Sequence, residues 1–322
     1  MSQTTRLFKS FSRLIFPVIL LLSLAVVAVS VWLVHKAAAP PRTAYLVTPE
    51  KYGQFSTRGA QVTEETWTNG DGSPSRGWLL RGSEGLPAVI LLHHYGADRS
   101  HVLDLAVKMS EATNYTVLMP DARGHGVNPA ISQSSFGGCE NDDAIAAVGF
   151  LRGLKGLSQT PLVGKNIGFY GVEMGALGAL AAAAKDADIK ALALDSVPLS
   201  SDDILASAVE RRFPGAGQIT SKFADLGTRF YFYNGCYRRD AACDTAKSIA
   251  NRQVLLLAGA DAPKLQDSTA KLNRCFPSST KVEAKTDLNP SGYGLANASL
   301  EQSAAYDQRV IEFFKMALSS EK

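Results

Sequence analysis

Residues 171–175, GVEMG, carry the arrangement that could do chemistry. They join a strand-like run, NIGFY (166–170), to a small-residue run that favours a helix, GALGALAAAA (175–184). A strand, a sharp turn and a helix around Gly-x-Ser-x-Gly expose a serine nucleophile. In this chain the central residue is Glu173. The motif therefore presents a carboxylate where a hydroxyl is expected.

The groups that could exchange protons with Glu173 are unevenly placed. All five histidines lie in the first 125 residues, at His35, His93, His94, His101 and His125. A histidine close to Glu173, such as His94, could form with its carboxylate a general acid–base couple. With His93 it could instead ligate a metal, although no ligand spacing is recognisable. The structural interpretation is that one histidine is buried and the other hydrogen-bonds Glu173.

Strand-like and helix-like runs alternate along the chain that positions these residues. Strands are expected at about 61–68, 76–81, 87–94, 115–120, 166–170, 190–196, 253–261 and 280–285, and helices at 100–112, 140–154, 175–184 and 301–318. This alternation predicts an α/β fold with a mostly parallel central sheet and helices on both faces. In such sheets, sites form at the carboxyl ends of the strands.

A long segment separates two of the buried strands. Residues 199–250 are too many for a simple crossover and predict an inserted cap over the strand ends. The aromatic run FYFYNGCY (230–237) would pack within this cap or line an apolar ligand pocket.

The N-terminal region predicts a membrane anchor. Residues 14–34 carry no charge and are long enough for a transmembrane helix. A basic tail, residues 1–13, precedes them and favours a cytoplasmic N-terminus. Residues 35–60 are expected to be a linker to a main domain outside the cytoplasmic membrane. A cleaved signal peptide, with AAA at 37–39 as its cleavage site, is the alternative.

Charge and cysteine content bound the function further. The net charge is only +3, and the basic excess comes from the N-terminus, so nothing suggests a nucleic-acid partner. Four cysteines can pair in an oxidising compartment. We expect a local bridge between Cys236 and Cys243, with Cys139 and Cys275 as a second pair or free. Sequence alone does not choose among the three connectivities, and it does not give the oligomeric state.

Six motifs in order resemble the α/β-hydrolase superfamily, specifically its lipase and serine-aminopeptidase-like branch. They are LLHHYGADRS (91–100), PDARGHG (120–126), GFYGVEMGALGAL (168–180), ALALDSV (191–197), LLLAGADAP (255–263) and NPSGYGL (289–295). The likeness covers about residues 61–319, with the cap inserted at about 199–250. It implies an α/β-hydrolase fold for these residues, which follow the transmembrane helix predicted from residues 14–34.

The resemblance implies roles that this chain fills in an unusual way. Glu173 stands at the serine position, Asp261 at the acid position and Tyr293 at the histidine position, and no histidine follows residue 125. Oxyanion donors are implied from the backbone of Met174 and of the loop near Tyr95. A Glu173 carboxylate could occupy that hole itself, as a stable anion at a helix N-terminus.

Two functional interpretations follow. The first is a pseudoenzyme that binds a small molecule, lipid or peptide under its cap, without cofactor or metal. The alternative is an active hydrolase of ester or peptide substrates that uses Glu173 with His94. Haloalkane dehalogenases and epoxide hydrolases use an aspartate nucleophile on this fold, but they also need the histidine that is missing here. Asp195 is interpreted as a structural hydrogen-bonding residue and His125 as a loop residue.

Overall fold

A single mixed sheet organises the chain in the computed structural model, which describes residues 3–42, 44–215 and 217–319. The strand order is β1-β2-β4-β3-β5-β6-β7-β8. β1 and β4 run antiparallel to β2, and all other neighbours are parallel, which confirms the predicted α/β class. The strands are β1 (Thr63–Thr68), β2 (Pro74–Leu80), β3 (Leu86–Leu92), β4 (Thr116–Pro120), β5 (Val163–Val172), β6 (Ile189–Asp195), β7 (Gln253–Gly259) and β8 (Lys281–Leu288).

Burial follows the residue pattern of each strand. The continuous apolar runs of β4 and β7 are buried almost throughout, as expected for strands covered on both faces. The edge strand β1, TEETWT, stays largely exposed and carries charged residues, which discourages pairing with another chain.

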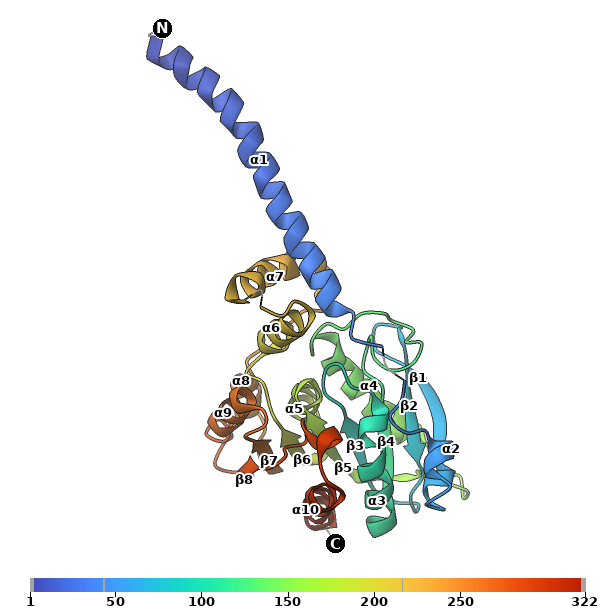
Figure 1. Cartoon of the computed structure of the whole chain (residues 1–322). Coiled ribbons are helices and arrows are strands. Elements are labelled where there is room, and N and C mark those ends of the chain that lie inside the picture. Colours follow the sequence, from blue (N-terminus) through green and yellow to red (C-terminus); the bar gives the residue numbers. More distant parts are fainter. Residues whose placement is uncertain (1–2, 43, 216, 320–322) are drawn as a thin grey trace. The chain divides into compact units, whose positions relative to one another are not determined.

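Helices cover both faces of the sheet (Figure 1). On one face, α10 packs against β5, β6 and α3, and on the other α5 packs against β3, β5, β6, α4 and α8. Alternate residues of β5 show the two layers: Gly168 lies against Phe314 of α10, whereas Gly171 lies against Gly175 of α5. The helices of these layers are α3 (Leu103–Thr113), α4 (Cys139–Gly153), α5 (Met174–Lys185), α8 (Ala242–Lys247), α9 (Pro263–Leu272) and α10 (Leu300–Ser319).

The N-terminal helix is longer than the span predicted from the sequence. α1 (Gln3–Ala38) contains residues 14–34 and continues into the expected linker. Its segment Ile15–Ala38 is long and apolar enough to cross a membrane. The rest of the expected linker contains α2 (Pro49–Tyr52) and a 3₁₀ turn (Gly59–Gln61), and Tyr45 and Tyr52 pack against the core of the domain.

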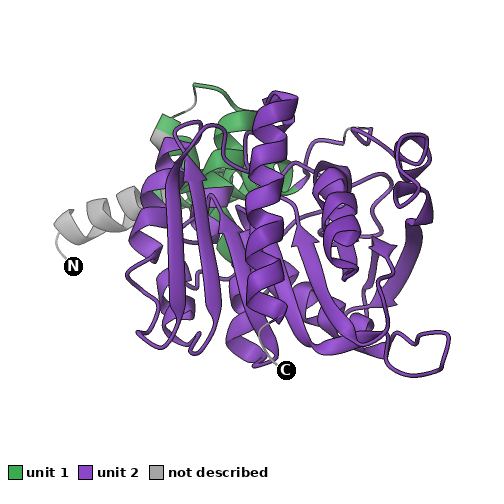
Figure 2. Ribbon diagram, turned by 90° about the horizontal axis from the view of Figure 1, so that it is seen from below, with its two compact units in different colours: residues 1–38, 205–235 green, residues 39–204, 236–322 purple. Residues whose placement is uncertain are grey.

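The chain divides into two compact units, which Figure 2 colours separately. One comprises residues 1–38 and 205–235, so it joins α1 to part of the segment inserted between β6 and β7. The other comprises residues 39–204 and 236–322 and holds the whole sheet. The inserted segment contains α6 (Ser201–Arg212), α7 (Gly217–Tyr231) and α8.

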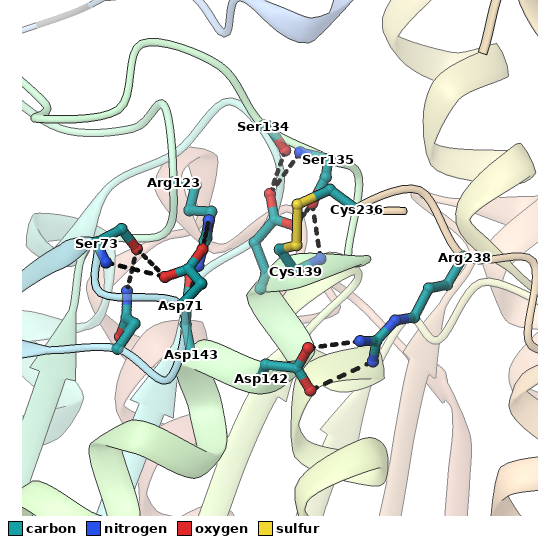
Figure 3. Close-up of a disulfide and its surroundings, with 12 residues drawn as sticks. Asp71, Ser73, Arg123, Ser134, Ser135, Cys139, Asp142, Asp143, Cys236 and Arg238 are labelled. Carbon is teal, nitrogen blue, oxygen red and sulfur yellow. Dashed lines mark hydrogen bonds and ion pairs between the residues drawn. A yellow bond between two sulfur atoms is a disulfide. The ribbon is translucent and has the colours of Figure 1, made fainter. Parts of the chain in front are cut away.

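The disulfide prediction was wrong. The structure pairs Cys139 with Cys236, across 97 residues (Figure 3), and Cys243 with Cys275, across 32 residues. The first bridge forms because the backbone of Cys236 lies against Gly138, at the start of α4. Sequence separation carried no information about this contact, which depends on the return of the chain from the inserted segment.

Candidate functional site

The turn between β5 and α5 holds Glu173 in a backbone conformation that side chains rarely adopt. Its φ is 48° and its ψ is −107°, a strained combination for a residue other than glycine. The flanking glycines make the turn sterically feasible. A Cβ at Gly171 would overlap the Gly175 carbonyl, and one at Gly175 would overlap the Leu92 carbonyl of β3. The turn geometry of Gly-x-Ser-x-Gly is therefore kept without the serine.

The Glu173 carboxylate is buried against the loop that follows β3. Only 1% of the residue is exposed, and the backbone N–H of Tyr95 donates to its Oε2 at 2.8 Å. The backbone N–H of Glu173 itself donates to the carbonyl of Asp195 at 3.0 Å. Met174, the first residue of α5, is also buried, and its sulfur accepts a hydrogen bond from Ser134. The carboxylate is thus held by a main-chain donor from a neighbouring strand end.

Two of the nearby histidines are fixed by hydrogen bonds at both ring nitrogens. His93 Nε2 accepts the Ala122 N–H at 3.1 Å, so its Nδ1 carries the proton that is donated to the His94 carbonyl. His125 is held in the same way between the Gly96 N–H and the Arg123 carbonyl. Burial lowers the pKa of both imidazoles. Both are therefore neutral structural residues and offer no free nitrogen to a metal.

His94 lies on the side of the loop that faces Tyr293. Its Nδ1 lies 2.9 Å from the Tyr95 carbonyl, so that nitrogen donates its proton to the backbone. Its ring centroid is 4.8 Å from that of Tyr293. The structure therefore brings together the loop after β3 and the loop after β8, as the sequence-predicted site requires. Among the described residues, no group of three or more histidine, cysteine or acidic residues is placed to hold a metal ion.

The side-chain carboxylate of Asp261 binds Ser291 in the loop after β8. The Ser291 N–H donates to Asp261 Oδ1 at 3.0 Å, and the Ser291 hydroxyl donates to Oδ2 at 2.8 Å. The Asp261 carboxylate also lies against Gly294. Asp261 therefore contacts the loop both before and after Tyr293. Its carboxylate positions a loop backbone, where an acid of a catalytic triad would orient an imidazole.

A second carboxylate, that of Asp195 at the end of β6, binds the same loop through Gly292. It is fully buried at the end of β6 and accepts hydrogen bonds from Gly292 N–H at 2.9 Å, Tyr306 hydroxyl at 2.7 Å and Ser196 hydroxyl at 2.7 Å. Burial raises the pKa of Asp195, and these three donors oppose that rise by stabilising the anion. Tyr170 of β5 extends the network to Tyr306. The arrangement agrees with the structural role that we assigned to Asp195.

Ion pairs hold the loop after β4 in place. Asp121 is buried, lies 3.3 Å from the Arg99 guanidinium and accepts the Arg99 N–H at 3.1 Å, which ties it to the loop after β3. Arg123 binds both carboxylate oxygens of Asp143 and also reaches Asp71 (Figure 3). The PDARGHG motif therefore supports the histidine-bearing loop rather than contributing a reactive group.

A cavity of about 210 Å³ lies beside His94 and Tyr293. Apolar side chains such as Val102 and Leu105 form part of its wall, and His101 and Ser303 add polar groups. All of its lining residues belong to the unit that contains the sheet. Its volume is below the range of about 300–1,000 Å³ that is typical of pockets for drug-sized ligands, so it has room only for a smaller molecule.

Several solved structures superpose on most of this chain. An esterase from Pyrococcus furiosus, Pf2001, superposes with a TM-score of 0.61 at 20% identity, over 87% of this chain and 98% of the esterase. GrgF, an α/β hydrolase from Penicillium, gives a TM-score of 0.58 at 16% identity over 80% of this chain and 99% of that one. A dienelactone hydrolase from Anabaena variabilis gives 0.54 at 14% identity, over 80% and 99% of the two chains.

The chain has the α/β-hydrolase fold. No protein-family description and no curated protein sequence matches it. The likeness is therefore one of backbone architecture, at identities that show the fold alone.

Each residue of the sequence-predicted site follows the end of a strand in this fold. Glu173 follows β5, Asp261 follows β7, and Tyr293 follows β8, while His94 and Tyr95 follow β3. Sequence reasoning missed Ser291, Tyr306 and Tyr170, which complete the hydrogen bonds around Asp195 and Asp261. Ser291 lies inside the NPSGYGL motif, but no pattern marks Tyr306, which comes from a helix face far along the chain.

Proposed function

We propose that this protein is a membrane-anchored, extracytoplasmic binding protein built on the α/β-hydrolase fold and lacking ordinary Ser-His-Asp hydrolysis. One observation carries the proposal: the Tyr95 N–H donates to Glu173 Oε2 at 2.8 Å. In active hydrolases the loop after this strand supplies an N–H to the oxyanion of the tetrahedral intermediate. A carboxylate that takes that donor competes with any such oxyanion.

The missing base supports the same proposal. Acyl transfer through Glu173 would create an anhydride, and its resolution needs a group that activates water. Tyr293 occupies the histidine position, and a tyrosine hydroxyl, with a reference pKa of about 10, is a weak base at neutral pH. His93 and His125 have both nitrogens engaged in hydrogen bonds. The proposed role is therefore binding without turnover.

The ligand that we propose is a small molecule in the 210 Å³ cavity beside His94 and Tyr293. Apolar walls would bury its carbon skeleton, and the polar side chains would fix its orientation. Ligands can be sought by thermal shift with a library of small metabolites. Ala296→Trp, at an exposed position of the lining, should fill the cavity and abolish any shift, whereas Asn297→Trp, outside the lining, should preserve it.

Membrane anchoring is supported by α1, whose segment Ile15–Ala38 suits a bilayer. The basic residues before this segment favour a cytoplasmic N-terminus, which would leave the sheet outside the cytoplasm. Two disulfides suit such an oxidising location. The protein should fractionate with membranes and resist extraction by high salt. A mature N-terminus near Ala39 in a soluble fraction would contradict the anchor.

Hydrolysis of a short-chain aryl ester, together with labelling by a serine-reactive phosphonate, tests the loss of catalysis. The full chain in detergent should show neither ester hydrolysis nor labelling, and the same result is expected for Glu173→Ala. Glu173→Ser should also be inactive, because serine without a base is a weak nucleophile. The double change Glu173→Ser with Tyr293→His restores nucleophile and base. We expect weak activity only there, since an error of about 1 Å in position can cost about 10²-fold in rate.

One result would reverse the proposal. Wild-type turnover that disappears in Glu173→Ala, with Glu173→Ser equally inactive, would mean that the carboxylate itself is catalytic. The alternative hydrolase mechanism, in which Glu173 works with His94, would then be favoured. His94→Gln should in that case abolish the same turnover.

A further inference from the structure

The helix α7 (Gly217–Tyr231) carries two distinct faces in the unit that it forms with α1. One face packs against α1 through small residues. The Gly227 backbone lies directly against the backbone of Ser30, in a contact that a Cβ at Gly227 would prevent. Small residues that allow helix backbones to approach closely are typical of helix pairs in membranes. Figure 1 shows α7 beside the last turns of α1.

Further contacts fix this end of α1 to the inserted segment. The His35 ring nitrogen lies 3.1 Å from the Tyr231 hydroxyl. Trp32 packs against Phe213 with ring centroids 5.4 Å apart. In contrast, large apolar residues between Phe16 and Leu24 are exposed, so the earlier part of α1 has no protein cover. The side chains of α1 are therefore mostly exposed in its earlier part and become packed against protein near Ser30.

The second face of α7 is an apolar stripe that is exposed at both ends, whereas Phe223 and Leu226 in its middle are partly buried. Its members recur at intervals of three and four residues, which places them on one side of the helix and its continuation: Ile219, Phe223, Leu226, Phe230 and Tyr233. Ile219, Phe230 and Tyr233 are 70%, 52% and 91% exposed. The exposed basic residues Lys222 and Arg229 flank the stripe on one side. An apolar stripe bordered by basic residues is the pattern of helices that lie in a membrane interface.

The length of α1 sets the depth of its contact with α7. A hydrocarbon core of about 30 Å takes about 20 helical residues. Starting at Leu14, after the last basic residue of the tail, the core is crossed near Leu33. Ser30 then lies within about 5 Å of the boundary, at 1.5 Å per residue. Because Gly227 contacts Ser30, α7 must lie at that boundary too.

We propose that α7 is a membrane-interface helix, and that its stripe of Ile219, Phe223, Leu226, Phe230 and Tyr233 inserts into the lipid bilayer beside α1. The inference rests on α1 as a membrane anchor, but it adds a second contact with lipid. Lys222 and Arg229 would meet the phosphate groups of the lipid heads. A bilayer covers the stripe without a further protein partner, because α1 already places it at the right depth.

Spin labels on the full chain in liposomes test this proposal. All four native cysteines are paired, so single changes to cysteine give specific attachment sites. Ile219→Cys and Phe230→Cys report on the stripe. Leu22→Cys on bare α1 is the lipid control, and Leu157→Cys, at a 99% exposed residue of the other unit, is the water control. Each label is measured for collision with oxygen, which enters lipid, and with a water-soluble nickel chelate.

The expected result is an oxygen-to-nickel ratio at residues 219 and 230 severalfold above that at 157 and approaching that at 22. Nickel access at 219 and 230 equal to that at 157 would place the stripe in water and overturn the inference while α1 remains an anchor. Protection from both reagents would mean protein contact, from a second copy or another partner, and would overturn it as well. A water-exposed label at 22 would remove both the anchor and the inference.

Discussion

The two sides of the candidate site keep their backbone geometry by different means. On the elbow side, the turn around Glu173 depends on steric contacts, because Gly171 and Gly175 leave no room for a Cβ. On the side of the loop after β8, the backbone is held by hydrogen bonds to Asp195 and Asp261. Neither device needs a serine at position 173 or a histidine at position 293. The comparison teaches that steric packing and hydrogen bonding are two separate ways of fixing the loop backbones of one site.

Gly175→Ala should break the elbow side most severely. The added Cβ would meet the Leu92 carbonyl, a backbone atom that cannot move without distorting β3, so we expect a loss of about 3 kcal/mol or more in the free energy of unfolding. Gly149→Ala in α4 is the matched control, because nothing lies near its Cβ. It should stabilise by up to about 1 kcal/mol. Urea unfolding in detergent measures both, and equal effects would contradict the steric account.

Asp195→Ala tests the hydrogen-bonded side. Two buried hydroxyl donors and the partly buried Gly292 N–H would lose their acceptor, so we expect a loss of about 3 kcal/mol in the free energy of unfolding. Asp261→Ala removes an exposed carboxylate and should cost about 1 kcal/mol. Unfolding of the two variants under the same conditions gives the comparison. If Asp261→Ala were the more damaging change, the exposed acid would be the main anchor of the loop.

His125→Gln should alter the pH dependence of stability. Burial holds the pKa of His125 well below that of an unfolded histidine, about 6.5. Below pH 6.5 the unfolded chain therefore binds a proton that the fold does not, and stability falls as the pH falls. Glutamine keeps a donor and an acceptor but does not titrate. Between pH 6.5 and 5, wild type should lose up to about 1.4 kcal/mol per pH unit more than the variant. Identical slopes in urea titrations would refute this role.

The smallest effect is expected at Glu173 itself. Both Glu173→Gly and Glu173→Ala remove the carboxylate, but only glycine adopts a φ of 48° without strain. Glu173→Gly should therefore be more stable than Glu173→Ala by about 1 kcal/mol. This comparison isolates backbone strain, because the side-chain contact with Tyr95 is lost in both variants. Equal stability would mean that the turn relaxes once the carboxylate is gone.

The sequence by itself determined the class of fold and the order of its strands along the chain. Continuous apolar runs such as those of β4 and β7 predict buried strands, because both faces of such a strand are covered and both sets of alternating side chains must be apolar. The glycines around Glu173 marked the elbow because the turn excludes larger residues there. The absence of histidine beyond residue 125 fixed, without any structure, that no imidazole can follow β8.

Only the tertiary structure decided which cysteines, hydrogen-bonding groups and helices contact one another. The link between Cys139 and Cys236 depends on where the chain returns after the inserted segment, and no local pattern records that return. The partners of Asp195 come from the loop after β8 and from α10, so they meet only when the sheet and its helices assemble. The sequence alone assigns α7 only to the inserted segment, and the contact between Gly227 and Ser30 shows that this helix packs against the apolar helix α1. Local periodicity specifies faces, but only long-range packing specifies what each face meets.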